Sequence, residues 1–251
     1  MEVKRSPFQG VSNIIRFNWH FYAIVLLLLL TVLLFHDLLP ELLQPLAFAG
    51  ALLGLITLFI SLLVSYYVYD ASDLYELNWL GENEGKNLLN INAGFDEISS
   101  IIRSKHPKAS LSICDFYHPL KHTEISIKRA RKAYPPQAES VEVSTEKLPF
   151  PNEHFDKVLA VLSAHEIRDH KERALFFDEL NRITKADGNI YVTEHLRDTY
   201  NFLAYTIGFL HFHSKASWKE TFQQADLRIS QEIKTTPFIT TFILEKNGNT
   251  T

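Results

Sequence analysis

Two long apolar runs near the N-terminus constrain this chain more than any other feature. They cover residues 18–36 and 46–64, and the second lies within a charge-free stretch from residue 45 to residue 69. A helix rises about 1.5 Å per residue, so about 20 apolar residues cross a hydrocarbon layer about 30 Å thick. We therefore predict two transmembrane helices, at about residues 18–36 and 45–67, in an N-terminal anchor that comprises residues 1–69. Tyr66, Tyr67 and Tyr69 at the end of the second run are typical of an interfacial aromatic belt.

Charged residues around the two runs predict an orientation. Lys4, Arg5 and Arg16 precede the first run, the connector 36–44 has no Lys or Arg, and the next basic residue is Lys86. The positive-inside rule then predicts that both ends lie in the cytoplasm, which gives a multi-pass protein with the bilayer as a partner. Two alternatives stay open. One is a secretory signal, because residues 47–49 mimic a cleavage site, although this site lies inside the second run. The other is a helix pair that lies on the membrane or packs as a soluble core.

The chain changes character after residue 69, where short apolar runs alternate with helical stretches. We expect helices near residues 96–104, 121–133 and 170–185. The runs that read as buried strands cover residues 88–92, 111–115, 141–143, 157–162, 189–194, 227–233 and 238–244. Strands that alternate with helices predict a parallel sheet covered on both faces, and the last two runs predict a closing hairpin that adds an antiparallel strand. The expected fold class is α/β, with a Rossmann-like seven-stranded sheet in a domain at residues 70–247.

Composition excludes several other kinds of protein. The net charge of −4 and the lack of a long Lys/Arg block give no support for a nucleic-acid partner. Cys114 is the only cysteine, which excludes an intrachain disulfide framework and a Cys-rich metal site. We expect Cys114 to be a small core residue.

In open sheets of this kind, ligands bind beyond the carboxyl ends of the strands, so the residues just after each strand are the candidates for chemistry. The first strand is followed by Ala93 and Gly94, and the second ends at Asp115. A carboxylate at the end of the second strand can accept both hydroxyl hydrogens of a ribose. A nicotinamide site would need a G-x-G-x-x-G loop, but this window contains only Gly94. A phosphate-binding P-loop is not present in the sequence either.

Two further segments resemble those of a known family. Residues 146–158 resemble the stretch E-x-L-P-F-P-D-x-x-F-D-x-V, and residues 177–189 are similar to the run E-x-x-R-V-L-K-P-G-G. Both are found in class I S-adenosylmethionine-dependent methyltransferases, particularly the type 11 group that modifies small molecules and quinones. The resemblance covers about residues 69–245. It implies a methyltransferase fold, S-adenosyl-L-methionine as the cofactor, and transfer of a methyl group.

The resemblance also implies which residues bind the cofactor. They follow the first three strands, end the fourth, or lie in a Y-D-x-x-x-x-x-Y segment that folds over the cofactor in similar enzymes. The predicted set is Tyr75, Asn92, Ala93, Gly94, Asp115, Phe116, Ser144, Thr145, Glu146 and Leu162.

The glycine loop departs from the family pattern D-x-G-x-G-x-G. This chain has Asn90, Asn92, Gly94 and Asp96 in those places, and Ser144 stands where the family often has an Asp. Asn tolerates a positive φ better than most residues, so we expect Asn92 to keep the turn.

The residues after the fourth and fifth strands are candidates for the acceptor side of the site. We predict His165, Glu166 and His195 as catalytic residues, with an imidazole as general base because it titrates near neutrality. The alternative is that these histidines are satisfied polar residues at strand ends. His211 and His213 alternate as in a strand, but two such residues are a weak signal for zinc, and we expect no metal site.

The predicted function is a membrane-anchored methyltransferase that acts on a lipophilic small molecule, such as a quinone precursor, a phenolic lipid or a pigment. The apolar stretch 201–212 is expected to be a core helix, or alternatively a lid that admits such a substrate from the bilayer. Two other functions stay open. One is a non-catalytic membrane adaptor with a degenerate methyltransferase fold, and the less favoured one is methylation of a protein or peptide.

Overall fold

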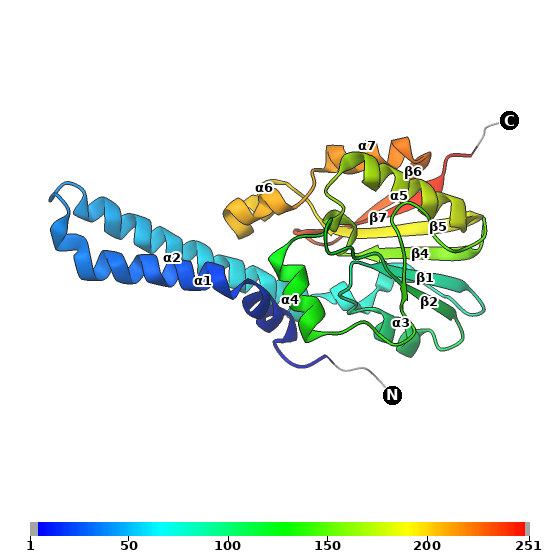
Figure 1. The fold of residues 1–251 in the computed structure, drawn as a ribbon, viewed down its shortest axis with the longest axis horizontal. Helices are drawn as coiled ribbons and strands as arrows, with labels where there is room; N and C mark the ends of the chain where they lie inside the picture. The colour runs from blue at the N-terminus through cyan, green and yellow to red at the C-terminus, as the bar shows by residue number, and fades with distance from the viewer. Residues whose placement is uncertain (1–4, 249–251) are drawn as a thin grey trace.

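The computed structural model describes residues 5–248. A hairpin of two long helices projects from an α/β domain (Figure 1). Its helices are α1 (Gln9–Phe35) and α2 (Gln44–Tyr66), joined through a 3₁₀ turn at His36–Leu38. Their apolar windows have mean hydropathies of 2.3 and 2.5, and 0% of either window is buried. Both helices are therefore long and apolar enough to cross a membrane.

The first part of α1 belongs with the domain. The helix begins at Gln9, ahead of the predicted span, and loses helical geometry at Asn18, where φ is −117°. The amides of Gly10 and Val11 donate to the two carboxylate oxygens of Asp70, at 2.7 and 2.8 Å. This carboxylate satisfies amides that have no partner in the first turn of a helix and favours the positive end of its dipole. The segment before Asn18 is thus held against the chain that enters the domain.

The domain is built on one seven-stranded sheet. The strand order is β3-β2-β1-β4-β5-β7-β6, in which β7 runs antiparallel to both β5 and β6 and the other pairs are parallel. This confirms the predicted sheet with its closing hairpin. The strands are β1 (Asn87–Asn92), β2 (Ser110–Asp115), β3 (Val141–Glu142), β4 (Phe155–Val161), β5 (Thr184–His195), β6 (Leu227–Thr236) and β7 (Ile239–Lys246).

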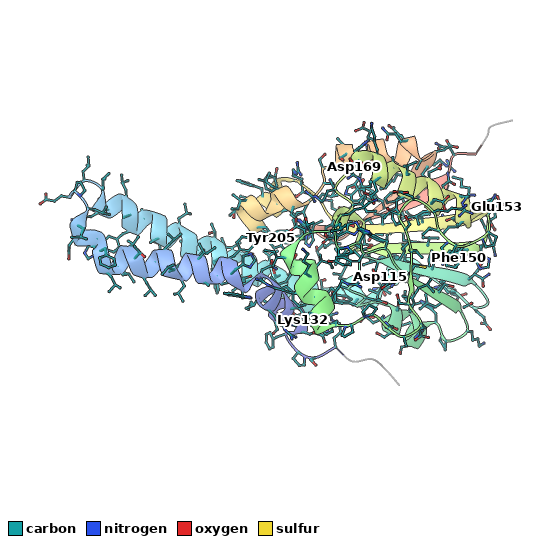
Figure 2. All side chains as sticks on the ribbon, in the orientation of Figure 1. Asp115, Lys132, Phe150, Glu153, Asp169 and Tyr205 are labelled. Atoms are coloured by element: carbon teal, nitrogen blue, oxygen red, sulfur yellow. The ribbon has the colours of Figure 1, made fainter. Side chains whose placement is uncertain are left out.

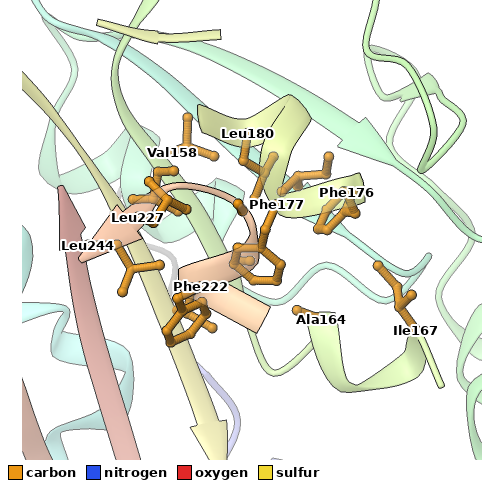
Figure 3. Packing of buried hydrophobic residues seen from close by; sticks show 14 of the residues in the cluster. Val158, Ala164, Ile167, Phe176, Phe177, Leu180, Phe222, Leu227 and Leu244 are labelled. Carbon is orange, nitrogen blue, oxygen red and sulfur yellow. The ribbon is translucent and has the colours of Figure 1, made fainter. Parts of the chain in front are cut away.

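Helices cover both faces of the sheet, as the apolar strand patterns require. On one face, α5 (His170–Ile183) and α7 (Lys215–Gln224) pack their aromatic side chains Phe177 and Phe222 against each other and over Val158 of β4 (Figure 3). On the other face, α3 (Ser99–Lys105) and the 3₁₀ turns at Asp73–Glu76 and Asn78–Leu80 form a second apolar cluster. Cys114 is fully buried in the first cluster, and burial raises the pKa of its thiol to about 12. The prediction that it is a core residue is confirmed.

Two helices at the carboxyl end of the sheet contact the hairpin. Helix α4 (Ile125–Ala133), which follows β2, contacts α1, and α6 (Thr199–Tyr205), which follows β5, contacts α2 (Figure 1). Helix α6 continues into a 3₁₀ helix at Thr206–His211. The stretch 201–212 is not the expected core helix, because Leu203 is 63% exposed and Ile207 is 77% exposed. Its apolar side chains face outward beside the hairpin instead.

The aromatic cluster at the end of α2 divides between two environments. Tyr66 and Tyr67 are exposed, as an interfacial belt requires. Tyr69 lies in a π-helical turn at Tyr67–Ala71, and its hydroxyl donates to Nε2 of His195 at 2.7 Å. The prediction for Tyr69 is therefore wrong, because a side chain held by a domain histidine does not face lipid.

Candidate active site

The loop after β1 keeps its shape through polar side chains in place of glycines. Gly94 has φ +87°, so the single remaining glycine takes the left-handed conformation. Asn92 does not adopt a positive φ, and in this respect the expectation is wrong. Its Oδ1 accepts a hydrogen bond of 2.7 Å from the Gly94 amide, which closes the turn from the side. Asn90 donates to Oδ1 of Asp96 at 3.0 Å, and the same oxygen accepts from the amide of Ser99 at the start of α3.

Asp115 ends β2 and is 2% exposed. One carboxylate oxygen accepts from the amide of Tyr117 at 2.8 Å, and the other is paired with the guanidinium of Arg131 from α4. The guanidinium also lies over the ring of Tyr117, at 4.3 Å from its centre. A Cβ at Gly94 would overlap Arg131. The side chain of Arg131 therefore fills the space between Gly94 and the carboxylate of Asp115 that was predicted to bind the ribose.

Tyr75 is held beneath the N-terminus of α1. Its hydroxyl donates to Glu97 at 2.7 Å, and the guanidinium of Arg5 lies 3.6 Å from its ring centre while also bonding Glu97 at 2.8 Å. Burial and the nearby Glu97 charge raise the pKa of the Tyr75 hydroxyl well above its usual value. Tyr75 thus fixes the segment that enters the domain close to the loop after β1.

Three other residues that were predicted to bind the cofactor differ in burial and in backbone conformation. Ala93 is buried behind the loop. Phe116 is 1% exposed and its side chain packs against Phe176 in the core, so only its backbone is left to contact a cofactor, and that contact stays a prediction. Leu162 at the end of β4 has φ +50°, an uncommon conformation for a branched residue.

The third-strand residues form a polar group at the same edge. Ser144 accepts from the amide of Glu146 at 3.1 Å, and Thr145 donates to Glu172 at 2.5 Å. Lys121 bonds both Glu146 and Glu172.

The two family-like segments contact each other away from these groups. Arg182 donates to the carbonyl oxygens of Leu148 and Phe150 at 3.0 and 2.8 Å, and Glu179 accepts from the amide of Leu148 at 2.7 Å. Glu179 and Arg182 also bond each other. Glu179 and Arg182 therefore stabilise the turn before β4, and this structural role accounts for the two family-like segments without a part in the chemistry.

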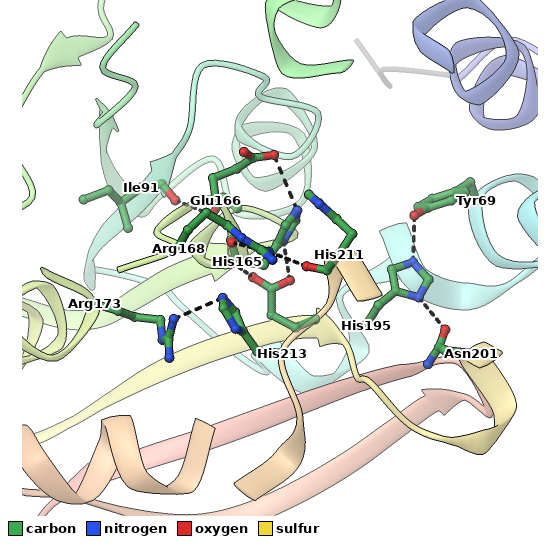
Figure 4. Close-up of polar contacts among 12 residues, drawn as sticks. Tyr69, Ile91, His165, Glu166, Arg168, Arg173, His195, Asn201, His211 and His213 are labelled. Atoms are coloured by element: carbon green, nitrogen blue, oxygen red, sulfur yellow. Dashed lines mark hydrogen bonds and ion pairs between the residues drawn. The ribbon is translucent and has the colours of Figure 1, made fainter. Parts of the chain in front are cut away.

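His165, labelled in Figure 4, forms a buried ion pair with Glu194 on the acceptor side. Glu194 lies near the carboxyl end of β5 and is fully buried. Its carboxylate accepts a hydrogen bond of 2.6 Å from Nδ1 of His165 and one of 3.1 Å from the backbone amide of His165. Although burial alone lowers the pKa of the imidazole, the carboxylates of Glu194 and Glu166 raise it to about 9. His165 is accordingly protonated at neutral pH and cannot act as a general base in this state.

His195 lies apart from this pair. Its Nδ1 contacts Oδ1 of Asn201 at 3.0 Å, its Nε2 accepts from Tyr69, and its ring stacks on Phe212. Burial lowers the pKa of this imidazole to about 4. Both ring nitrogens are occupied by neutral partners, so the alternative interpretation as a satisfied polar residue describes His195 and the catalytic prediction does not.

The structure separates His211 from His213. His213 is buried, its Nε2 accepts from Arg173 at 3.1 Å, and burial together with that guanidinium lowers its pKa to about 3. His211 faces His165 instead, with ring centres 4.9 Å apart, and its Nδ1 lies 3.3 Å from Glu124. Glu166, the third predicted catalytic residue, is 5% exposed and lies beside both rings.

Sequence reasoning missed three residues that shape this region, Glu124 just before α4, Arg131 in α4 and Glu194 in β5. It noted His211 only as a weak zinc signal beside His213. Only Glu194 carried a usable signal, since it lies near the end of a predicted strand. Figure 2 labels Asp115 within the α/β domain and Tyr205 on the side of the domain that faces the hairpin.

The comparisons with known proteins agree with this architecture. Residues 114–192, from the end of β2 to near the end of β5, match the family described as a methyltransferase domain. An S-adenosylmethionine-dependent methyltransferase from Aquifex aeolicus is 14% identical, with a TM-score of 0.53 over 75% of this chain and 97% of that chain. PigF, solved with SAH, is 15% identical, with a TM-score of 0.50 over 71% of this chain and 61% of that chain. No curated protein matches the sequence.

The sheet order, the two covering layers and these likenesses define a class I methyltransferase fold. Residues 114–192 are similar to that family, and two long apolar helices precede this part of the chain.

Proposed function

We propose that this protein is a membrane-anchored, S-adenosylmethionine-dependent methyltransferase that acts on a lipophilic small molecule, such as a quinone precursor, a phenolic lipid or a pigment. The observation that carries the proposal is the contact between the apolar hairpin and the site loops. Phe17 of α1 packs against Phe95 in the loop after β1, with ring centres 5.6 Å apart. The guanidinium of Arg129 in α4 donates to the carbonyl of Phe17 at 2.6 Å.

The hairpin itself supports a bilayer as partner. Its apolar windows are not covered by the domain, and soluble proteins rarely expose an apolar surface of this extent. The outward apolar side chains of α6 and the following 3₁₀ helix lie beside α2 and extend that surface. A site at this edge would receive a lipophilic acceptor from the bilayer without drawing it through water. The basic residues before the first span favour a cytoplasmic domain.

The residues of the cofactor side fit S-adenosylmethionine once Arg131 moves. Gly94 offers a backbone that a ligand can approach closely, and the buried carboxylate of Asp115 can accept the ribose hydroxyls. The cofactor supplies a methyl group on a sulfonium, which is electrophilic. The chain's own contribution is to bind, orient and exclude water, because neither His165 nor His195 is free to take a proton.

A direct binding measurement tests this proposal. S-adenosylmethionine and S-adenosylhomocysteine would be titrated calorimetrically into the detergent-solubilised full chain, with Asp115→Ala as the matched variant. We expect binding that is lost in Asp115→Ala. A lipid extract incubated with radiolabelled cofactor then identifies the acceptor by its label. A folded protein that releases no heat with either ligand would remove the methyltransferase assignment.

The ion pair between Arg131 and Asp115 favours a second candidate function. A guanidinium held against that carboxylate suits a domain that kept the sheet and lost the cofactor. Such a protein would act as a non-catalytic membrane adaptor. It would stay folded, with an unchanged melting temperature, at any concentration of cofactor.

A further inference from the structure

We propose that His165, Glu166 and His211 form a binding site for a first-row transition-metal dication such as Zn²⁺, Co²⁺ or Mn²⁺. One nitrogen or oxygen atom from each of the three residues lies within 4.8 Å of the others. Ligands bound tetrahedrally at about 2.1 Å lie about 3.4 Å apart, so the ligand atoms need to approach one another by at most about 1.4 Å. Two imidazoles and one carboxylate are a donor set that suits these metals and that Mg²⁺ avoids.

Glu166 carries an independent indication of a ligand. Its side chain is 6% exposed, its Oε1 lies 3.6 Å from Nε2 of His165, and its Oε2 has no hydrogen-bond partner within residues 5–248. A buried carboxylate oxygen without a partner costs free energy, and a cation in the cluster removes that cost.

The surroundings of His165 are those of a metal-ligating histidine. Glu194 holds Nδ1, so Nε2 is the nitrogen that faces Glu166 and His211 (Figure 4). A carboxylate on the far nitrogen fixes the ring orientation and raises its basicity, which is the usual support for such a ligand. Glu124, 3.3 Å from His211, is placed as a further ligand or support.

The charges in this region also favour a dication. Three carboxylates face the two rings, those of Glu124, Glu166 and Glu194, and Arg168 contributes one opposing charge through its bonds to the carbonyls of His165 and His211. With neutral imidazoles, two net negative charges remain.

His165 and Glu166 follow the carboxyl end of β4, and Glu194 lies near the carboxyl end of β5, on the edge of the sheet where we propose that the acceptor binds. If the proposed methyl transfer holds, the metal would bind and orient an oxygen of the acceptor and lower the pKa of a hydroxyl there. Metal binding itself does not depend on that reaction, so the test is made without cofactor.

The experiment is a titration of Co²⁺ and Zn²⁺ into the untagged full chain in detergent. Co²⁺ absorption in the visible range reports imidazole ligation, and calorimetry reports the stoichiometry and the Kd. We expect one Co²⁺ per chain, displaced by Zn²⁺. Glu194→Gln should weaken binding by about 10- to 100-fold. Glu166→Gln and His211→Ala should weaken it at least as much.

His154→Gln is the matched control, because His154 lies just before β4, at the opposite end of that strand from the cluster. It should bind Co²⁺ like the unaltered chain. Equal binding in Glu166→Gln and His211→Ala would overturn the proposal, as would the lack of a stoichiometric Co²⁺ spectrum. Failure of cofactor binding with an intact Co²⁺ site would remove the methyltransferase function and leave the metal site standing.

Discussion

Tyr69 of the helix hairpin donates its hydroxyl hydrogen to Nε2 of His195 at the end of β5, at 2.7 Å. This bond crosses 126 residues of sequence and ties the end of the second apolar helix to the carboxyl edge of the sheet. It fixes the position of the helix hairpin relative to the candidate site. Because the pKa of His195 is lowered to about 4, the ring stays neutral and keeps its acceptor nitrogen at physiological pH.

Tyr69→Phe removes only the hydroxyl group and keeps the packing of the ring, so it should destabilise the protein through the lost hydrogen bond alone. The loss of one buried hydrogen bond costs about 1 kcal/mol. Thermal unfolding in detergent measures the change, and Tyr67→Phe is the control because Tyr67 is 42% exposed. Equal melting temperatures for Tyr69→Phe and the unaltered chain would show that the bond does not hold the two parts together.

The ion pair of His165 with Glu194 predicts how stability changes with pH. The pKa of His165 is raised to about 9 in the folded state, above about 6.5 for an unfolded histidine. The folded state thus holds the proton more tightly, so this contribution is complete below pH 6.5 and is lost as the pH rises through 9. The melting temperature should fall between pH 6.5 and 9. His165→Gln should reduce that slope, and an unchanged slope in this variant would contradict the assignment.

Removal of Arg131 should strengthen cofactor binding. The guanidinium occupies the space above Gly94 and pairs with Asp115, so a bound cofactor has to displace it. A charge-assisted hydrogen bond is worth about 1.5–3 kcal/mol, so Arg131→Ala should lower the Kd for S-adenosylhomocysteine by about 10-fold or more. Lys132→Ala in the same helix is the control, since Lys132 is exposed. Weaker binding in Arg131→Ala would mean that the arginine contacts the cofactor.

Asp70 should control how firmly the start of α1 is docked. Its carboxylate accepts from the amides of Gly10 and Val11, and caps of this kind are worth about 0.5–2 kcal/mol. Asp70→Ala should raise amide hydrogen exchange in residues 9–17, while Asp73→Ala should not. Unchanged exchange in Asp70→Ala would show that packing alone holds the segment.

The outward apolar face of α6 should lie in the bilayer interface. The only native cysteine is buried with a thiol pKa of about 12, so introduced cysteines can be labelled separately. In lipid nanodiscs, Leu203→Cys should be protected from a membrane-impermeant maleimide, and Asp187→Cys should react. Equal labelling of the two would place α6 in water.

Much of the fold follows from the sequence because burial leaves a local pattern. The strand runs, the closing hairpin and the acidic end of β2 were predictable, since each depends on the residues of one segment. The two long helices were predictable for the same reason, although the start of α1 was not. Its first turn contains the polar residues Gln9 and Ser12, and the amide of Gly10 is bonded by Asp70, 60 residues away.

Which side chains meet at the candidate site was decided by the tertiary structure. The side chains of Phe116 and Tyr69 pack against residues from distant segments, so their surroundings could not be read from the sequence. The glycine-poor loop is held by hydrogen bonds to side chains, which its glycine pattern does not reveal. The group of His165, Glu166 and His211 has no spacing that marks it, because its residues meet only where the segments after β4 and before α7 converge. The sequence thus determined the sheet and the apolar hairpin through local burial, and the topology decided which polar groups share a site.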